Sequence, residues 1–151
     1  MPTLAEILAE FPGATLGENC WETSPKSEAY NCFAWAAEDD TRHWDPRTQF
    51  HPYGGYWPRR APAGLTVSAI EATFRMVGGY VRTNNDKPEP GICKVAVFAH
   101  NGRPTHMARQ LASGKWASKL GADEDIEHSS PSVLEGGDYG RVVLLLARRV
   151  I

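Results

Sequence analysis

The chain has 151 residues, a formal charge of −2 and three cysteines, and 42% of its residues are hydrophobic. These values are typical of one globular domain over 1–151, and they argue against nucleic acid or a membrane surface as the main partner. No apolar run is long enough to cross a bilayer. The N-terminus lacks a basic region and the cysteines have no CxxC spacing. We therefore predict a cytoplasmic protein, or one exported without a cleaved Sec signal peptide.

Two helices are predicted near the N-terminus. Apolar residues at helical spacing after Thr3 predict a short helix over 3–11, and a loop follows over 12–26. A second helix is predicted over 30–40, with Cys32 in its first turn. Backbone N–H groups and the positive end of the helix dipole favour a thiolate at such a position, so we expect a lowered thiol pKa.

Residues 41–65 form a long segment in which aromatic residues stand among prolines and glycines. A segment of this length without regular structure is usually functional, and its aromatic content argues against disorder. We interpret it as a folded flap that lines one side of a cleft. The flap residues expected to contact a substrate are Trp44, Tyr56 and Trp57.

A third helix is predicted over 67–77, with Ser68 and Glu71 as a capping box and Gly78 after its end. Its expected buried stripe consists of Ile70, Phe74 and Val77. Beyond this helix the hydrophobic period changes to two, which predicts strands. The predicted strands cover 80–83, 92–100, 106–112, 115–120 and 141–150. The expected fold class is α+β, with N-terminal helices packed on an antiparallel sheet of four to six strands within 92–150.

A cysteine nucleophile needs a base within hydrogen-bond reach, and a third group that orients the base. His106 is the best-placed base, because it opens a strand in the middle of the predicted sheet. A three-residue loop with a bulge at Gly114 would place Ser118 on the His106 face, whereas a two-residue turn would place Lys119 there. Since glycine suits the bulge, we favour Ser118.

The order of these elements resembles the papain-like fold, and most closely its NlpC-type branch of cell-wall peptidases and amidases. The resemblance rests on a cysteine on a helix and on the segment "HMARQLASGKWASKL". The third position in that branch is usually His, Asn or Gln, and Asp usually precedes the nucleophile, where this chain has Ser118 and Asn31. The motifs "YNCFAWA" and "HMARQLASGKWASKLG" are also similar to a family of uncharacterised bacterial domains, which implies no activity.

The resemblance implies a papain-like, NlpC-like fold and a cysteine hydrolase or acyltransferase acting on an amide or ester bond. Cys32 would be the nucleophile, His106 the base and Ser118 the orienting residue. The Cys32 N–H, with Asn31 or Tyr30, would stabilise the oxyanion. Lys119 would bind a carboxylate or the oxyanion if it faces the cleft. The expected substrate is a peptide or another amide, as for a peptidase or a toxin-like effector, and no cofactor is expected.

Several alternatives stay open at this point. In one alternative the domain is a non-catalytic module with the same fold, and its flap binds a peptide or a protein partner. A metal site at Cys32 and His106 is a further alternative, although no ligand pair has a recognised spacing. His128 is either a third catalytic group or, as we favour, a helix cap beside a solvated acidic turn over 123–125. Cys20 and Cys93 are expected to be core residues.

Overall fold

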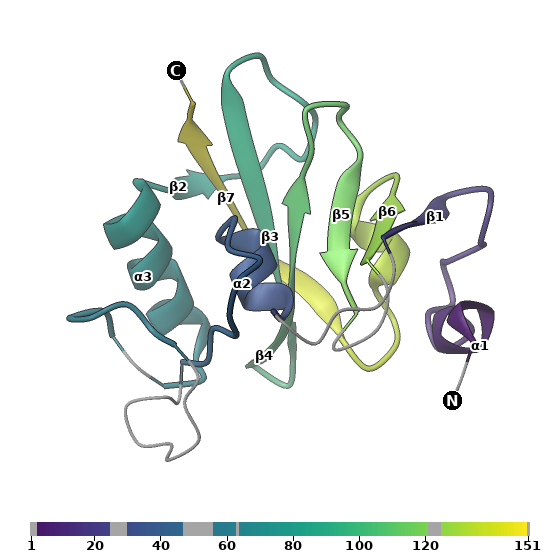
Figure 1. Ribbon diagram of the computed structural model, residues 1–151, viewed down its shortest axis with the longest axis horizontal. Coiled ribbons are helices and arrows are strands. Elements are labelled where there is room, and N and C mark those ends of the chain that lie inside the picture. The colour runs from purple at the N-terminus through teal and green to yellow at the C-terminus, as the bar shows by residue number, and fades with distance from the viewer. Residues whose placement is uncertain (1–2, 25–29, 47–55, 63, 121–124, 151) are drawn as a thin grey trace.

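The computed structural model describes residues 3–24, 30–46, 56–62, 64–120 and 125–150. Within these ranges the chain forms one seven-stranded sheet with the order β1-β6-β5-β4-β3-β7-β2, and all of its strand pairs are antiparallel (Figure 1). The strands are β1 (Cys20–Ser24), β2 (Val81–Thr83), β3 (Ile92–His100), β4 (Arg103–Gln110), β5 (Trp116–Lys119), β6 (Asp125–His128) and β7 (Arg141–Arg149). The helices are α1 (Leu4–Leu8), α2 (Cys32–Ala36), α3 (Val67–Gly78) and the 3-10 helix η2 (Pro131–Leu134).

The predicted α+β class, with a papain-like or NlpC-like arrangement of helices on a smaller sheet, is wrong. The chain is mostly β, and only α3 among the described α-helices is longer than five residues. The difference comes from two short strands that the pattern does not predict. β1 lies in the predicted loop 12–26, and β6 lies where an acidic turn and a cap are expected. These two strands pair with each other at one end of the sheet.

The two faces of the sheet carry separate apolar clusters. On the face covered by α2 and α3, Cys32 and Phe74 pack with Val97, Met107 and other inward residues of β3, β4 and β7. Figure 1 shows α2 in front of β3 and β4, with α3 beside it. We call this the α2 face. It buries the side chains of alternate strand residues, as the two-residue period of a strand requires.

The opposite face is covered by α1, η2 and their connecting segments, and we call it the η2 face. Here Phe98 of β3, Ala108 of β4 and Trp116 of β5 pack against Leu8 and Leu134. Along each strand these residues alternate with the residues of the α2 face, so their side chains point to the opposite side of the sheet. Both faces are buried, so β3 is apolar almost throughout its length.

Helix α3 has the predicted position with a different cap. The Oγ1 of Thr66, rather than that of Ser68, accepts the hydrogen bond from Ala69 N at 3.1 Å. Gly79 ends the helix in the left-handed region, with φ of 69°. Ile70 and Phe74 are fully buried as predicted, whereas Val77 is 46% exposed. The predicted stripe is therefore one turn shorter at its C-terminal end. None of the helices in the described part of the chain combines the length and hydrophobicity of a membrane span.

The turn between β4 and β5 has the predicted three-residue form. Leu111 N donates to Lys115 O at 2.8 Å, and Gly114 adopts a φ of 92° that favours glycine. The strands pair as Arg109 with Ala117 and Gln110 with Trp116. This register places Ser118 on the face of Ala108 and His106, and Lys119 on the opposite face.

Candidate functional site

Cys32 is the first residue of α2, directly after its N-cap. Its side chain is 9% exposed and packs in the cluster of the α2 face. Burial raises the pKa of the thiol to about 11, and hydrogen bonds from the backbone N–H groups of Met107 and Phe33 oppose this only in part. The expected lowering of the pKa does not occur, because a helix of five residues has a weak dipole and the thiol is shielded from water. At neutral pH the thiol is protonated.

Asn31 and Tyr30, the candidate oxyanion residues, have structural partners. The Asn31 Oδ1 accepts hydrogen bonds from Ala34 N at 3.1 Å and Trp44 N at 3.0 Å, and its Nδ2 donates to Trp44 O at 2.7 Å. Asn31 thus caps α2 and holds the start of the flap. The Tyr30 hydroxyl donates to Asp125 Oδ2. Both groups are engaged before any substrate arrives.

Lys119 and Asp125 form a buried ionic pair on the α2 face. Both side chains are almost fully buried, and Lys119 Nζ lies 3.8 Å from Asp125 Oδ1. The Lys119 ammonium also lies 5.2 Å from the centre of the Tyr30 ring. The solvated acidic turn predicted over 123–125 is therefore wrong at Asp125, which is 2% exposed; residues 123 and 124 lie outside the described residues. Lys119 faces inward, and its charge balances a carboxylate of the protein itself.

His106 lies on the η2 face in a chain of hydrogen bonds. Its Nε2 is 2.9 Å from Ser118 Oγ, as predicted for these two side chains. Ser118 Oγ is in turn 2.8 Å from His128 Nε2, and His128 Nδ1 is 2.8 Å from Ser130 O. The side chains of His106, Ser118 and His128 are fully buried. His128 is thus a residue of β6 within this chain, and the predicted helix cap is wrong.

The carbonyl of Ser130 determines which atom is the donor and which the acceptor in each hydrogen bond of this chain. A carbonyl only accepts, so His128 Nδ1 carries the proton. Burial lowers the pKa of His128 to about 4, so its Nε2 is bare at neutral pH and accepts from the Ser118 hydroxyl. Ser118 Oγ then accepts from His106 Nε2–H. His106 Nδ1 is left as a bare, buried nitrogen without a hydrogen-bond partner among the described residues.

The structure does not bring Cys32 and His106 together. Cys32 packs on the α2 face beside Met107, whereas the His106 ring contacts Phe98 and stacks on Tyr139 at 4.1 Å on the η2 face. Adjacent residues of a strand point to opposite faces, so a thiol beside Met107 lies across the sheet from the imidazole of His106. Burial also lowers the pKa of His106 well below its usual range. A nucleophile and its general base must lie within hydrogen-bond distance of each other, about 3 Å.

The described part of the flap is mostly packed in the core. Trp44 and Trp57 are each 7% exposed and belong to the cluster of the α2 face. Their indole N–H groups donate to Asp39 Oδ2 at 2.9 Å and Pro62 O at 2.8 Å. Tyr56 is half-buried, and the Arg42 guanidinium lies 3.5 Å over its ring. Trp44 and Trp57 therefore support the fold, and residues 47–55 and 63 of the predicted flap lie outside the described residues.

A groove of about 620 Å³ lies across the ends of β3 and β4. Residues 88–93, 109–112, Glu38 and Val150 line it. Cys93 is therefore a groove residue that is half-buried, unlike Cys20, which is fully buried as predicted.

Arg109 is a groove residue that the sequence analysis does not predict. Its signal is visible in the sequence, because a charged residue two positions after Met107 lies on the same buried face of the strand. Sequence reasoning missed it by searching for nucleophiles and bases.

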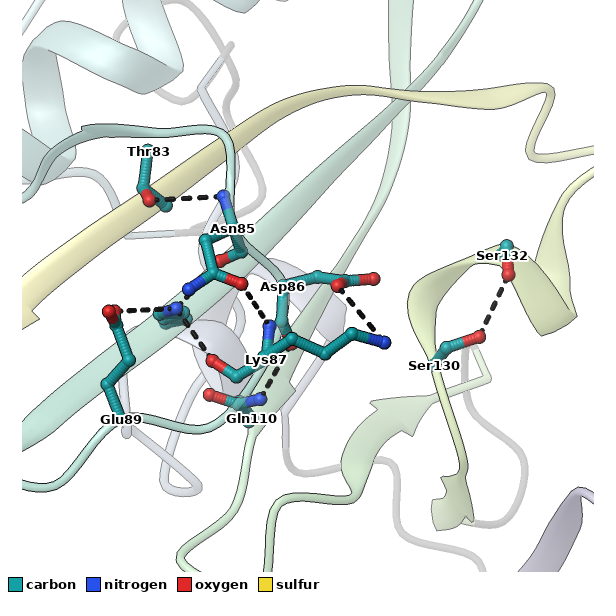
Figure 2. Close-up of polar contacts among 9 residues, drawn as sticks. Thr83, Asn85, Asp86, Lys87, Glu89, Gln110, Ser130 and Ser132 are labelled. Atoms are coloured by element: carbon teal, nitrogen blue, oxygen red, sulfur yellow. Dashed lines mark hydrogen bonds and ion pairs between the residues drawn. The ribbon is translucent and has the colours of Figure 1, made fainter.

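The loop over 85–89, of which Pro88 and Glu89 line the groove, is fastened to the sheet by a buried lysine. Lys94 Nζ donates to Asn85 O and Lys87 O, each at 2.7 Å, and lies 2.8 Å from the Glu89 carboxylate. Gln110 Nε2 donates to Asp86 O at 3.0 Å from the neighbouring strand. Figure 2 shows Gln110 joined to Asp86, with Asn85, Lys87 and Glu89 beside them. Four contacts with β3 and β4, and a hydrogen bond within the loop from Lys87 N to Asn85 Oδ1 at 2.9 Å, hold this side of the groove in a pre-formed position.

Comparison with known proteins identifies a family without a described activity. The family model described as a domain of unknown function, DUF7689, matches residues 21–147. No curated protein and no solved structure matches the chain. No group of three or more His, Cys, Asp or Glu side chains that could hold a metal ion occurs in the ranges that the structure describes.

Proposed function

This chain belongs to the DUF7689 family, and we propose that it is a non-catalytic module that binds a peptide in the groove across β3 and β4. The observation that carries the proposal is the groove itself. Its volume of about 620 Å³ is within the usual range of ligand sites, roughly 300–1,000 Å³. Its wall is pre-formed, which lowers the entropic cost of binding.

The chemistry of the walls supports a peptide as the ligand. Pro88, Pro90, Ile92, Leu111 and Val150 supply apolar surface. Charged groups stand beside them, with Glu38 and Arg109 at the same groove. Apolar walls with a few polar groups suit an extended chain segment with apolar side chains, because the polar groups orient a ligand whose affinity comes from apolar burial.

The arrangement of the buried groups supports a binding role over the predicted cysteine hydrolase. A hydrolase of that kind requires the Cys32 thiol beside an exposed, basic imidazole. Here the thiol is protonated, the imidazole of His106 is buried, and the sheet lies between them. Cys32 is also not among the residues that line the groove.

The proposal is tested by titrating the ¹⁵N-labelled protein with an equimolar library of N-acetylated tetrapeptides. We expect saturable amide shifts at Gly91, Ile92, Leu111 and Ala112. Ala112→Trp should abolish them by filling the groove, while Ala5→Trp, at an exposed position of α1, should leave them unchanged. Absence of shifts in the wild-type protein, or shifts that survive Ala112→Trp, would contradict groove binding.

Thiol labelling separates this proposal from the hydrolase. Iodoacetamide at pH 6 to 9 should modify Cys93 in the folded protein, and Cys20 and Cys32 only after unfolding, because both of the latter are buried. Rapid labelling of Cys32 at pH 6 that is lost in His106→Ala would instead establish a reactive Cys–His pair and overturn the non-catalytic assignment.

A further inference from the structure

Arg109 differs from the other shielded cations in the described part of the chain in having no counter-ion there. Among the described lysines and arginines, four are not exposed: Lys94, Arg109, Lys119 and Arg148. Lys94 pairs with Glu89, Lys119 with Asp125 and Arg148 with Glu38. No described carboxylate forms an ion pair with Arg109. A half-buried cation without an anionic partner is less stable than a paired one, so its place at a groove wall points to a negative charge that arrives with a ligand.

The guanidinium of Arg109 is held in one place. It lies 3.9 Å over the Trp35 ring, and its Nη1 donates to Trp35 O at 3.1 Å. This is the one hydrogen bond of the guanidinium with a described residue. Because a guanidinium has five N–H donors in a planar fork, most of them remain available for an incoming acceptor. The group is pre-organised for a planar, bidentate partner.

The remaining groove charges do not compensate Arg109. Glu38 is bound by Arg148 and Glu89 by Lys94, so each acidic residue of the wall already has its cation. The groove therefore carries about one uncompensated positive charge. A single guanidinium matches the charge and geometry of one carboxylate, whereas a phosphate dianion would keep half of its charge unbalanced against apolar walls.

We infer that Arg109 binds the C-terminal carboxylate of an apolar peptide. The inference rests on the proposed peptide-binding function, and adds the orientation and end group of the ligand. The carboxylate accepts from the Arg109 guanidinium, and the preceding side chains contact Ile92 and Leu111 along the groove. This is recognition of a chain end, in which the charge selects the terminus and the apolar walls select the residues before it.

The test compares two forms of the tetrapeptide library, one with free C-terminal carboxylates and one with C-terminal amides. The wild-type protein should bind the acid form at least tenfold more tightly, as measured by the amide shifts of Gly91 and Leu111. Arg109→Gln should reduce the ratio to about one. Arg103→Gln, at the exposed opposite end of the same strand, should leave the ratio unchanged.

The outcomes separate the two proposals. Equal binding of acid and amide forms by the wild-type protein would overturn the carboxylate assignment while leaving groove binding intact, and this comparison does not depend on any variant folding. Binding of neither form would overturn both. Inorganic phosphate serves as a third probe: if it displaces the acid peptides at equal concentration, the site selects phosphate and the carboxylate assignment fails.

Discussion

Two clusters of buried polar side chains, one on each face of the sheet, are stabilised by different means. On the η2 face, His106, Ser118 and His128 are neutral and are joined in a chain of hydrogen bonds that ends on a carbonyl. The α2 face buries a charged pair, in which Lys119 is balanced by Asp125. The difference indicates where an additional charged group would stabilise the protein. The neutral chain needs no counter-ion, although His106 Nδ1 has no hydrogen-bond partner among the described residues. A buried charge is stabilised by a counter-ion, and no described carboxylate forms an ion pair with Arg109.

The comparison also explains why neighbouring residues of one strand have unrelated roles. Ser118 and Lys119 are adjacent in β5, yet one belongs to the neutral chain and the other to the ionic pair. The same holds for His106 and Met107 of β4, of which only Met107 lies beside Cys32. Alternation along a strand thus separates residues that the sequence places together.

The largest effect is expected from breaking the ionic pair of the α2 face. Lys119→Met should lower the free energy of unfolding by about 3–5 kcal/mol, because it leaves the Asp125 carboxylate buried without its cation. Urea denaturation followed by tryptophan fluorescence measures this change. Lys87→Met is the matched control, since the Lys87 side chain is 82% exposed beside Asp86 and should cost less than about 1 kcal/mol. Equal losses in both variants would contradict a buried charged pair.

Acid should act mainly on the η2 face. The pKa of His128 is about 4 in the folded chain, below the ordinary value of 6.5, so the unfolded chain binds more protons in this interval. The stabilisation is complete above pH 6.5 and is lost as the pH falls toward 4, by about 3 kcal/mol for His128, and His106 acts in the same direction.

Chemical denaturation at a series of pH values measures this loss. His128→Gln should flatten the dependence between pH 6.5 and 4.5, because it removes the titrating group from the chain. A variant with the slope of the wild-type protein would show that the proton binds elsewhere.

A smaller effect is expected from removing the central hydroxyl of the η2 face. Ser118→Ala should cost about 1–3 kcal/mol of unfolding free energy, because His106 Nε2–H and His128 Nε2 both lose their partner inside the protein. Ser113→Ala, in the exposed turn before β5, is the control and should change the free energy by less than about 0.5 kcal/mol.

The double variant Ser118→Ala, Lys119→Met sharpens this prediction. The two side chains lie on opposite faces of β5, one in the neutral chain and the other in the ionic pair, so their free-energy changes should add, with a coupling below about 0.5 kcal/mol. A coupling above about 1 kcal/mol would show that the faces are not energetically separate.

The elements with strong local signals were predictable. β3 has the predicted bounds, because its apolar run is bordered by glycine and by a turn. α3 has the predicted position, since its period and its terminal glycines agree. The contact of His106 with Ser118 followed from the spacing and from Gly114, because turn length alone determines which residues of a hairpin share a face.

The short strands β1 and β6 were not predictable from their own residues. Each is four or five residues long and carries acidic side chains, a composition that is more typical of loops. They become strands because they pair with each other, with Cys20 opposite His128. This contact joins segments far apart in the chain, and it buries His128 and Asp125 where local composition indicates exposed groups.

The sequence by itself determined which residues of the β4–β5 hairpin lie together, because the two-residue period of a strand and the geometry of a turn are local properties. It determined the start of α1 after Thr3 and the glycine of the β4–β5 turn for the same reason. Only the tertiary structure decided which face of the sheet α2 covers. That choice depends on the summed packing of all elements, and it placed Cys32 beside Met107, left His106 on the other side, and brought Arg109 to the groove.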